Sequence, residues 1–249
     1  MLRFAGVTRK FPNGAGVEEL TFGVDPGEIL ALIGLNGAGK TTLMRLALEM
    51  LRPQDGHIEI FGTPLGQLPI QKWAHVGAAV ETALAYPELS TAENLQLAAS
   101  LRGADRDCVT EAIETWGLEP LARRPFSQLS LGNRQRVGLA AALQHDPDLI
   151  FLDEPSNSLD PASVIFLRNE LTKSAQSGAA ILVSSHHLDE VARIADRIIL
   201  MNHGRLIGEL HTTGPDLERT FFNRIHVDDR NRQTAAHAQM LESAAAEPN

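Results

Sequence analysis

The chain opens with short apolar runs that are separated by turn residues. These runs predict strands over residues 2–8, 19–24, 29–33 and 57–61. The tripeptides at 12–14 and 25–27 contain both Pro and Gly, and they predict turns between the strands. A helical pattern covers about 41–51, directly after a glycine-rich loop. The first part of the chain therefore predicts β-structure interrupted by one helix.

Strands and helices alternate in the second half of the chain. Residues 149–152, 180–183 and 198–201 are almost continuously apolar, which is typical of strands buried on both faces. Helical patterns over 161–175 and about 188–195 separate these strands. Because this alternation produces a parallel sheet covered on both faces, we predict an α/β fold.

The middle of the chain has helical character. Residues 90–93 read STAE, a capping box that begins a helix. We therefore expect one α/β domain over 1–226 with a helical insertion over about 83–143. Residues 227–249 are polar and Ala-rich without clear periodicity, and we expect a loosely ordered tail there.

Composition restricts the partners and the compartment. The chain has 22 basic and 31 acidic side chains and a net charge of −9, which argues against a nucleic-acid partner. Its single cysteine, Cys108, excludes a disulfide framework and fits a reducing compartment. No segment approaches the ~20 apolar residues of a membrane span, and residues 1–6 lack the apolar run of a secretory signal. We expect a cytoplasmic protein that reaches a membrane only through a partner.

Residues 34–41 read GLNGAGKT and match the phosphate-loop motif G-x-x-x-x-G-K-[ST] at every position. The loop follows a predicted strand and opens a predicted helix, so its backbone N–H groups can surround phosphates at a helix N-terminus. Lys40 can reach the β- and γ-phosphates, and the Thr41 hydroxyl can bind Mg²⁺. The residues expected to bind the nucleotide here are Gly34, Asn36, Gly37, Ala38, Gly39, Lys40, Thr41 and Thr42.

Two acids end the apolar strand at 149–152. Ligands bind at the carboxyl ends of strands in an open parallel sheet. Asp153 is therefore placed to hold Mg²⁺, and Glu154 to polarise an attacking water. Acids also favour the first turn of a helix, but the upstream phosphate loop favours the catalytic interpretation.

With these sites identified, residues 2–205 resemble the nucleotide-binding domains of ATP-binding-cassette (ABC) transporters. Residues 129–137, LSLGNRQRV, resemble the family signature, usually written LSGGQ followed by a basic residue, Gln and Arg. Residues 156–160 resemble the D-loop, and His186 resembles the switch histidine at a strand end. Phe11 stands where the family keeps an adenine-stacking aromatic, with a core aromatic as the alternative.

The resemblance implies ATP hydrolysis with Mg²⁺, coupled to closure of a dimer. It implies that Ser130 and Gly132 contact ATP held by a second ABC subunit, identical or different, and that Asp160 belongs to the same composite site. His186 would donate to the γ-phosphate or position the water, although a lone strand-end His most often bonds backbone. The second partner that the resemblance implies is an integral membrane permease, which would hold the chain at the inner face of the membrane.

Three residues depart from the family pattern. Leu131 replaces the first Gly of the signature, and Asn133 replaces its Gln. Glu81 stands where the family keeps a Gln that senses phosphate, and we expect it near the metal. This combination resembles the exporter branch that handles antibiotics and lantibiotic-type peptides. The bulky Leu131 is expected to point away from the phosphates.

Two other functions are compatible with parts of this sequence. The first is a soluble ABC ATPase without a membrane partner, although such relatives usually carry two cassettes or a long coiled coil. The second is a nucleotide-binding regulatory subunit without turnover, against which Glu154 and His186 argue.

Overall fold

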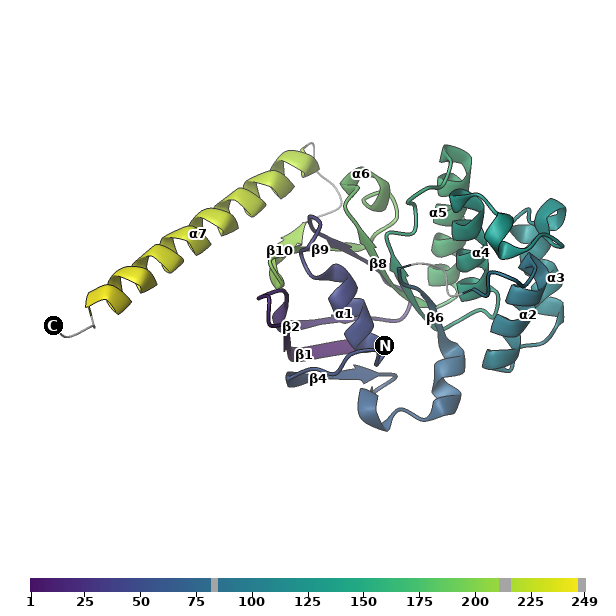
Figure 1. The fold of residues 1–249 in the computed structure, drawn as a ribbon, viewed down its shortest axis with the longest axis horizontal. Coiled ribbons are helices and arrows are strands. Elements are labelled where there is room, and N and C mark those ends of the chain that lie inside the picture. Colours follow the sequence, from purple (N-terminus) through teal and green to yellow (C-terminus); the bar gives the residue numbers. More distant parts are fainter. Residues whose placement is uncertain (82–84, 211–215, 246–249) are drawn as a thin grey trace.

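The computed structural model describes residues 1–81, 85–210 and 216–245, and from residue 235 onward it describes the backbone alone. Figure 1 shows a body of strands and helices from which one long helix extends. The strands are β1 Leu2–Lys10, β2 Gly16–Val24, β3 Ile29–Ile33, β4 Asp55–Ile60, β5 Thr63–Pro64, β6 Val76–Ala79, β7 Leu149–Asp153, β8 Ala180–Ser185, β9 Arg197–Asn202 and β10 Arg205–Leu210. The α-helices are α1 Lys40–Ala47, α2 Thr91–Arg102, α3 Asp107–Thr115, α4 Leu131–Leu143, α5 Pro161–Gln176, α6 Leu188–Val191 and α7 Leu217–Ala245. Short 3₁₀ turns span Leu65–Gln67, Ile70–His75, Glu119–Leu121 and Phe126–Gln128.

The strands form two sheets. The smaller sheet is antiparallel, with the order β2-β1-β4-β5. The larger sheet has the order β10-β9-β3-β8-β7-β6 and is parallel except for its edge strand β10. This architecture confirms the predicted α/β fold with a parallel sheet and an N-terminal antiparallel part.

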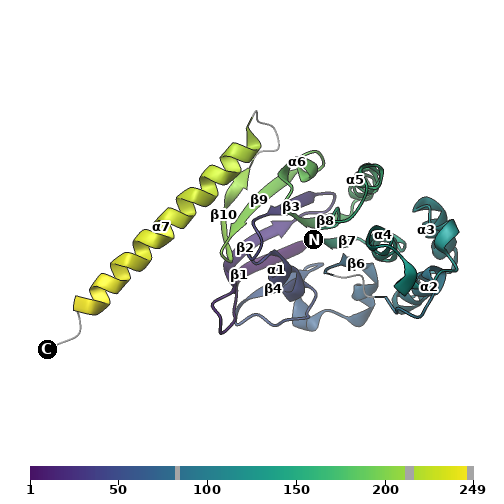
Figure 2. The same ribbon diagram turned by 45° about the horizontal axis from the view of Figure 1, so that its top comes forward.

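Side chains alternate between two cores along β3. Ile29, Ala31 and Ile33 face a core that is completed by α2, α4 and α5. Leu30 and Leu32 face the other core, which α1 and the antiparallel sheet complete. Figure 2 shows these layers with the large sheet between them. The phosphate loop joins β3 to α1, so a strand buried on both faces fixes its position.

In the sequence, helices α2, α3 and α4 follow β6 and precede β7, two strands that are neighbours in the parallel sheet. Ser90 begins α2 with the predicted capping box: the Glu93 N–H donates to Ser90 Oγ at 3.3 Å, and the Ser90 N–H donates to Glu93 Oε2 at 2.8 Å. The expected start of the insertion at residue 83 lies outside the described residues.

The C-terminal segment differs from its prediction as a loosely ordered tail. A single helix, α7, runs through this segment to Ala245. Its Ala, Gln, Leu, Met and Glu residues are strong helix formers, and helix propensity needs no amphipathic period. The start of α7 is anchored by the buried side chains Phe221 and Ile225. Asn202 Nδ2 also donates to Asp228 Oδ2 at 2.8 Å and to Asp229 Oδ1 at 2.9 Å.

Candidate nucleotide-binding site

The phosphate loop lies against two other segments of the chain. A Cβ atom on Gly34 would lie 2.4 Å from the Met201 carbonyl oxygen, so no larger residue fits there. Gly39 has a φ of 103° and lies so close to Gly16 that an added Cβ would come within 2.8 Å of its carbonyl oxygen. These contacts hold the loop in one conformation at the N-terminus of α1.

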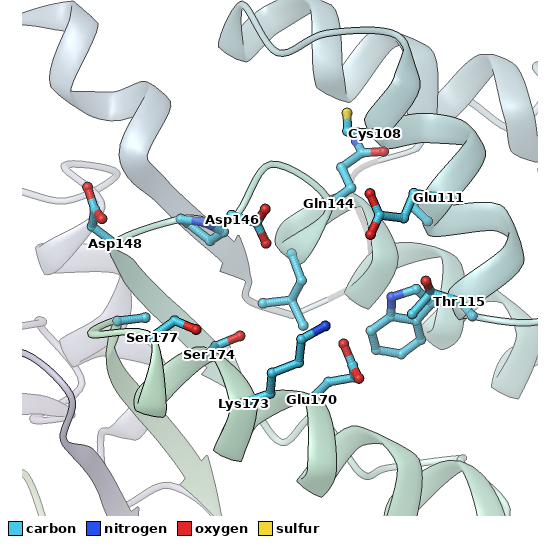
Figure 3. Close-up of a pocket in the computed structure, with 15 residues that line it drawn as sticks. Cys108, Glu111, Thr115, Gln144, Asp146, Asp148, Glu170, Lys173, Ser174 and Ser177 are labelled. Carbon is cyan, nitrogen blue, oxygen red and sulfur yellow. The ribbon is translucent and has the colours of Figure 1, made fainter.

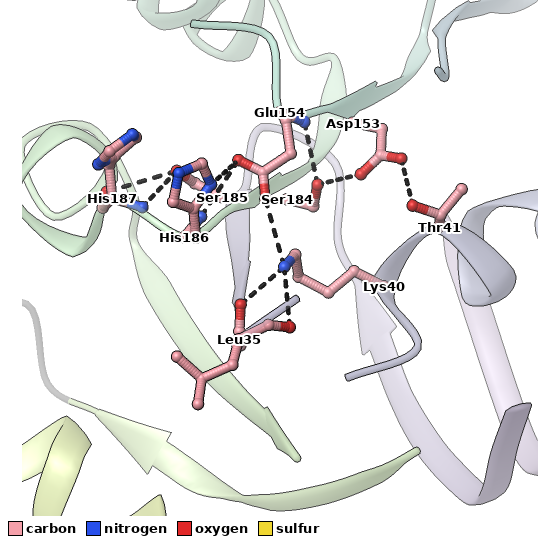
Figure 4. Close-up of polar contacts among 10 residues, drawn as sticks. Leu35, Lys40, Thr41, Asp153, Glu154, Ser184, Ser185, His186 and His187 are labelled. Atoms are coloured by element: carbon pink, nitrogen blue, oxygen red, sulfur yellow. Dashed lines mark hydrogen bonds and ion pairs between the residues drawn. The ribbon is translucent and has the colours of Figure 1, made fainter. Parts of the chain in front are cut away.

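Lys40 is buried inside the loop, with 6% of its surface exposed. Its Nζ donates to the Gly34 carbonyl oxygen at 2.7 Å and lies 3.2 Å from Glu154 Oε1 (Figure 4). The ammonium group therefore pairs with the carboxylate that was predicted to be the base. Glu154 has a φ of 49°, a conformation that non-glycine residues rarely adopt and that clusters at functional sites.

Asp153 ends β7 and is fixed by two hydroxyl groups. Thr41 Oγ1 donates to Asp153 Oδ2 at 2.6 Å, and Ser184 Oγ donates to Asp153 Oδ1. Ser184 is a site residue that the sequence interpretation did not assign. The sequence signal for it is its place directly after the apolar run 180–183, and the structure makes it the register partner of Asp153 on the neighbouring parallel strand.

The hydroxyl and carboxylate oxygens of Thr41 and Asp153 are the donors that Mg²⁺ prefers. Within the described residues, no group of three or more His, Cys, Asp and Glu side chains could hold a metal by itself. The donors therefore fit a Mg²⁺ ion that keeps waters and takes the phosphates as further ligands.

His186 follows β8 and contacts the same carboxylate as Lys40. Its Nδ1 lies 2.7 Å from Glu154 Oε2, and its backbone N–H donates to that oxygen at 3.2 Å. The neighbouring His187 is exposed, with its ring centroid 3.9 Å from that of His186. The structure thus brings Lys40, Glu154 and His186 together from three different elements.

Glu81 lies just beyond β6 and pairs with Arg45 of α1. The hydrogen bond from Arg45 to Glu81 holds the pKa of the guanidinium above its usual value. Glu81 also has a positive φ, of 63°. Glu81 accepts a hydrogen bond from Arg45, whereas Asp153 accepts hydrogen bonds from Thr41 and Ser184. The two predicted metal-binding acids therefore have different partners in the described structure.

The predicted signature residues lie at the start of α4. Ser130 caps this helix by accepting a hydrogen bond from the Asn133 N–H at 3.3 Å. Gly132 packs against the backbone of the predicted D-loop, where an added Cβ would lie 2.5 Å from the Ser158 carbonyl oxygen. Leu131 points outward, with 64% of its surface exposed.

Asp160 caps α5 and accepts the Ser163 N–H at 2.9 Å. Hydrogen bonds from Ser163 hold the pKa of Asp160 below its usual value. Among the described residues, no hydrogen bond or ion pair connects Ser130, Gly132 or Asp160 to the phosphate loop of the same chain. The structure therefore does not bring these three residues to the site around Lys40.

Phe11 lies in the connection between β1 and β2. At the end of this connection, Gly16 packs against Gly39 of the phosphate loop. The Phe11 ring is partly exposed and lies 5.4 Å from the Arg9 guanidinium carbon. This position fits a surface aromatic better than a core residue. The remaining loop residues of the prediction differ in exposure: Asn36 and Gly37 are exposed, Thr42 is half-buried and Ala38 is buried.

A separate pocket of about 420 Å³ opens between α3, the end of α4 and the end of α5 (Figure 3). Its charged lining consists of Glu111, Asp146, Asp148, Glu170 and Lys173. Asp148 immediately precedes β7, whereas Asp153 ends that strand, so roughly 17 Å of extended chain separates the two residues. This pocket is therefore distinct from the site around Lys40.

A phosphate loop between a buried strand and a helix, facing an acid at the end of another strand of the same parallel sheet, defines a P-loop nucleotide-binding protein. The ABC transporter family profile matches residues 17–157. The chain belongs to the ABC transporter family and is an ATP-binding, ATP-hydrolysing subunit of that family. None of the helices in the described residues is long and apolar enough to cross a membrane.

Two curated relatives and one solved structure illustrate the similarity. The bacitracin transport ATP-binding protein BcrA of Enterococcus faecalis is 40% identical over 82% of this chain and 67% of the relative. The SkfA peptide export ATP-binding protein SkfE of Bacillus subtilis (strain 168) is 37% identical over 85% of this chain and 89% of the relative. The dimeric structure of MJ0796, a bacterial ABC transporter cassette, matches with a TM-score of 0.78 and 25% identity over 86% of this chain and 100% of that chain.

Proposed function

We propose that this chain uses ATP hydrolysis to drive an integral membrane permease that exports an antibiotic or a peptide. The contact of Lys40 and His186 with the two oxygens of Glu154 carries the proposal, because it places a carboxylate between a phosphate-binding cation and an imidazole. The names of the relatives support the cargo class, since one is a bacitracin transport protein and another a peptide export protein.

In this proposal each strand end supplies one part of the reaction. Lys40 binds the β- and γ-phosphates, and Thr41 with Asp153 holds Mg²⁺, which would neutralise developing charge on the phosphates. Glu154 polarises the attacking water, and His186 orients it against the γ-phosphate. The geometry supports these roles because all five side chains converge from α1 and from the ends of β7 and β8 (Figure 4).

We further propose that two subunits close around two ATP molecules. Ser130 and Gly132 begin a helix, so they present a hydroxyl and backbone N–H groups to a phosphate. In the described part of the chain no hydrogen bond or ion pair joins them to their own phosphate loop, and the related cassette above is dimeric. The exposed Leu131 lies beside them and would contact the partner subunit.

In a Glu154→Gln background, ATP is expected to produce a dimer, and the further change Ser130→Arg is expected to abolish it. The reason is that Ser130 would touch only the nucleotide of the partner, so ATP should still bind to each monomer. Light scattering with and without ATP, beside calorimetric binding, measures both quantities. If Ser130→Arg removes ATP binding from the monomer, the signature acts within one chain and the dimer proposal is wrong.

Coupling to the permease gives a second test. Glu81 lies between the phosphate-loop core and the segment that leads to α2, so Glu81→Ala should reduce cargo transport more than nucleotide affinity. Transport by vesicles that contain the permease, compared with calorimetric ATP affinity, measures this ratio. Equal transport by wild type and variant would refute the role of Glu81, and an ATPase rate indifferent to any permease would favour a soluble ATPase.

A further inference from the structure

One face of α1 carries the contacts of both acids near the metal position. Thr41 and Arg45 are four residues apart on this helix and therefore project from the same face, one turn apart. Thr41 donates to Asp153 at 2.6 Å, whereas Arg45 pairs with Glu81. The helix that opens the phosphate loop thus positions one carboxylate through a hydroxyl and the other through a guanidinium.

The Arg45–Glu81 pair is suited to exchange. The side chains are 36% and 45% exposed, and exposed pairs of this kind add little net stability, so a stronger cation can displace Arg45 at low cost. The positive φ of Glu81 fixes the backbone from which its carboxylate reaches α1. The negative charge of Asp153 also attracts the Arg45 guanidinium, so Arg45 interacts electrostatically with both acids.

We propose that Arg45 is a positioning residue for Glu81. It holds the Glu81 carboxylate beside the metal position in the nucleotide-free protein and releases it when Mg²⁺ arrives with ATP. This inference rests on the proposed function, in which Glu81 senses the metal and phosphate. It adds the residue that keeps Glu81 in place before the metal binds.

The charge of Glu81 explains why such a partner is needed. Glu81 and Asp153 both act on Arg45, so once Arg45 is absent the repulsion between the two carboxylates favours outward movement of the more exposed group, Glu81. A neutral glutamine at this position would need no counter-ion. The function of Arg45 should therefore depend on the presence of a carboxylate at residue 81.

Magnesium dependence tests the proposal through a double-mutant cycle. The affinity of the non-hydrolysable analogue AMP-PNP is measured by calorimetry over a range of Mg²⁺ concentrations for wild type, Arg45→Gln, Glu81→Gln and the double variant. Loss of Arg45 lets repulsion from Asp153 move Glu81 away from the metal position, so the half-saturating Mg²⁺ concentration should rise by about fivefold, the upper range for one exposed pair. In the Glu81→Gln background the same change should have a clearly smaller effect.

Two control variants separate position from charge. Arg45→Lys keeps the charge and should stay nearer to wild type than Arg45→Gln. Arg219→Gln, on the exposed start of α7, removes the same charge away from the site and should leave the Mg²⁺ dependence unchanged. Thermal denaturation verifies that each variant is folded.

The outcomes distinguish this inference from the proposed function. If Arg45→Gln has an equal effect with Glu and with Gln at residue 81, or has no effect in either background, the positioning role is overturned while nucleotide binding stands. If wild-type protein does not bind AMP-PNP with Mg²⁺ at all, the proposed function itself fails.

Discussion

Glu154→Gln is expected to slow ATP hydrolysis by about 10²-fold or more, the usual contribution of a positioned general base. ATP should still bind, because the phosphate contacts of Lys40 and the loop backbone remain. Glutamine has nearly the same shape but cannot accept a proton from water at neutral pH. The variant also loses the ion pair of Glu154 with Lys40, which leaves the ammonium group free for the phosphates.

Single-turnover and steady-state phosphate release, with ATP affinity measured in parallel, test this expectation. Glu170→Gln is a matched control, because it removes the same charge at a residue that lines the distinct pocket near the end of α5. Turnover near that of wild type for Glu154→Gln would place the general base elsewhere, and equal slowing in the control would point to a loss of charge or stability.

Lys40→Ala is expected to weaken ATP binding by about 10²-fold or more. A hydrogen bond to a charged group contributes roughly 1.5–3 kcal/mol, and Lys40 can make such bonds to two phosphates. No other lysine side chain can replace it, because the other lysines of the chain are Lys10, Lys72 and Lys173, outside the phosphate loop.

Calorimetry at constant ionic strength measures this loss, and thermal denaturation separates it from unfolding. Lys173→Ala is a suitable control because Lys173 lies near the end of α5, in the pocket lining. Unchanged ATP affinity in Lys40→Ala would be incompatible with the phosphate-loop interpretation.

The sequence alone predicts the phosphate loop and the buried strands β3 and β7 closely, because both depend on local patterns, whereas β1, β2 and β4 extend two or three residues beyond their predicted ends and β10 was not predicted. The run at 149–152 ends in Asp153, and the structure places that acid beside Thr41 as the parallel sheet requires. The extent of α1 was less predictable. Apolar residues continue to Leu51, but α1 ends at Ala47, and Glu49 has a φ of 58°.

Pairing between side chains from distant segments could not be predicted from local patterns. Arg45 and Glu81 are 36 positions apart, and neither the helix pattern of one nor the strand pattern of the other names its partner. The contact of Glu154 with Lys40 likewise depends on how β7 and α1 pack together. Such contacts depend on three-dimensional packing, which hydrophobic periodicity determines only in outline.

The ion pair of Lys40 with Glu154 would link the arrival of substrate to the release of the proposed base. A triphosphate that engages the Lys40 ammonium would compete with the carboxylate 3.2 Å away. Until then, the proposed base is held in an ion pair, which weakens its capacity to accept a proton from water. The nucleotide-free subunit therefore holds its proposed base in an ion pair that ATP, by binding Lys40, would weaken.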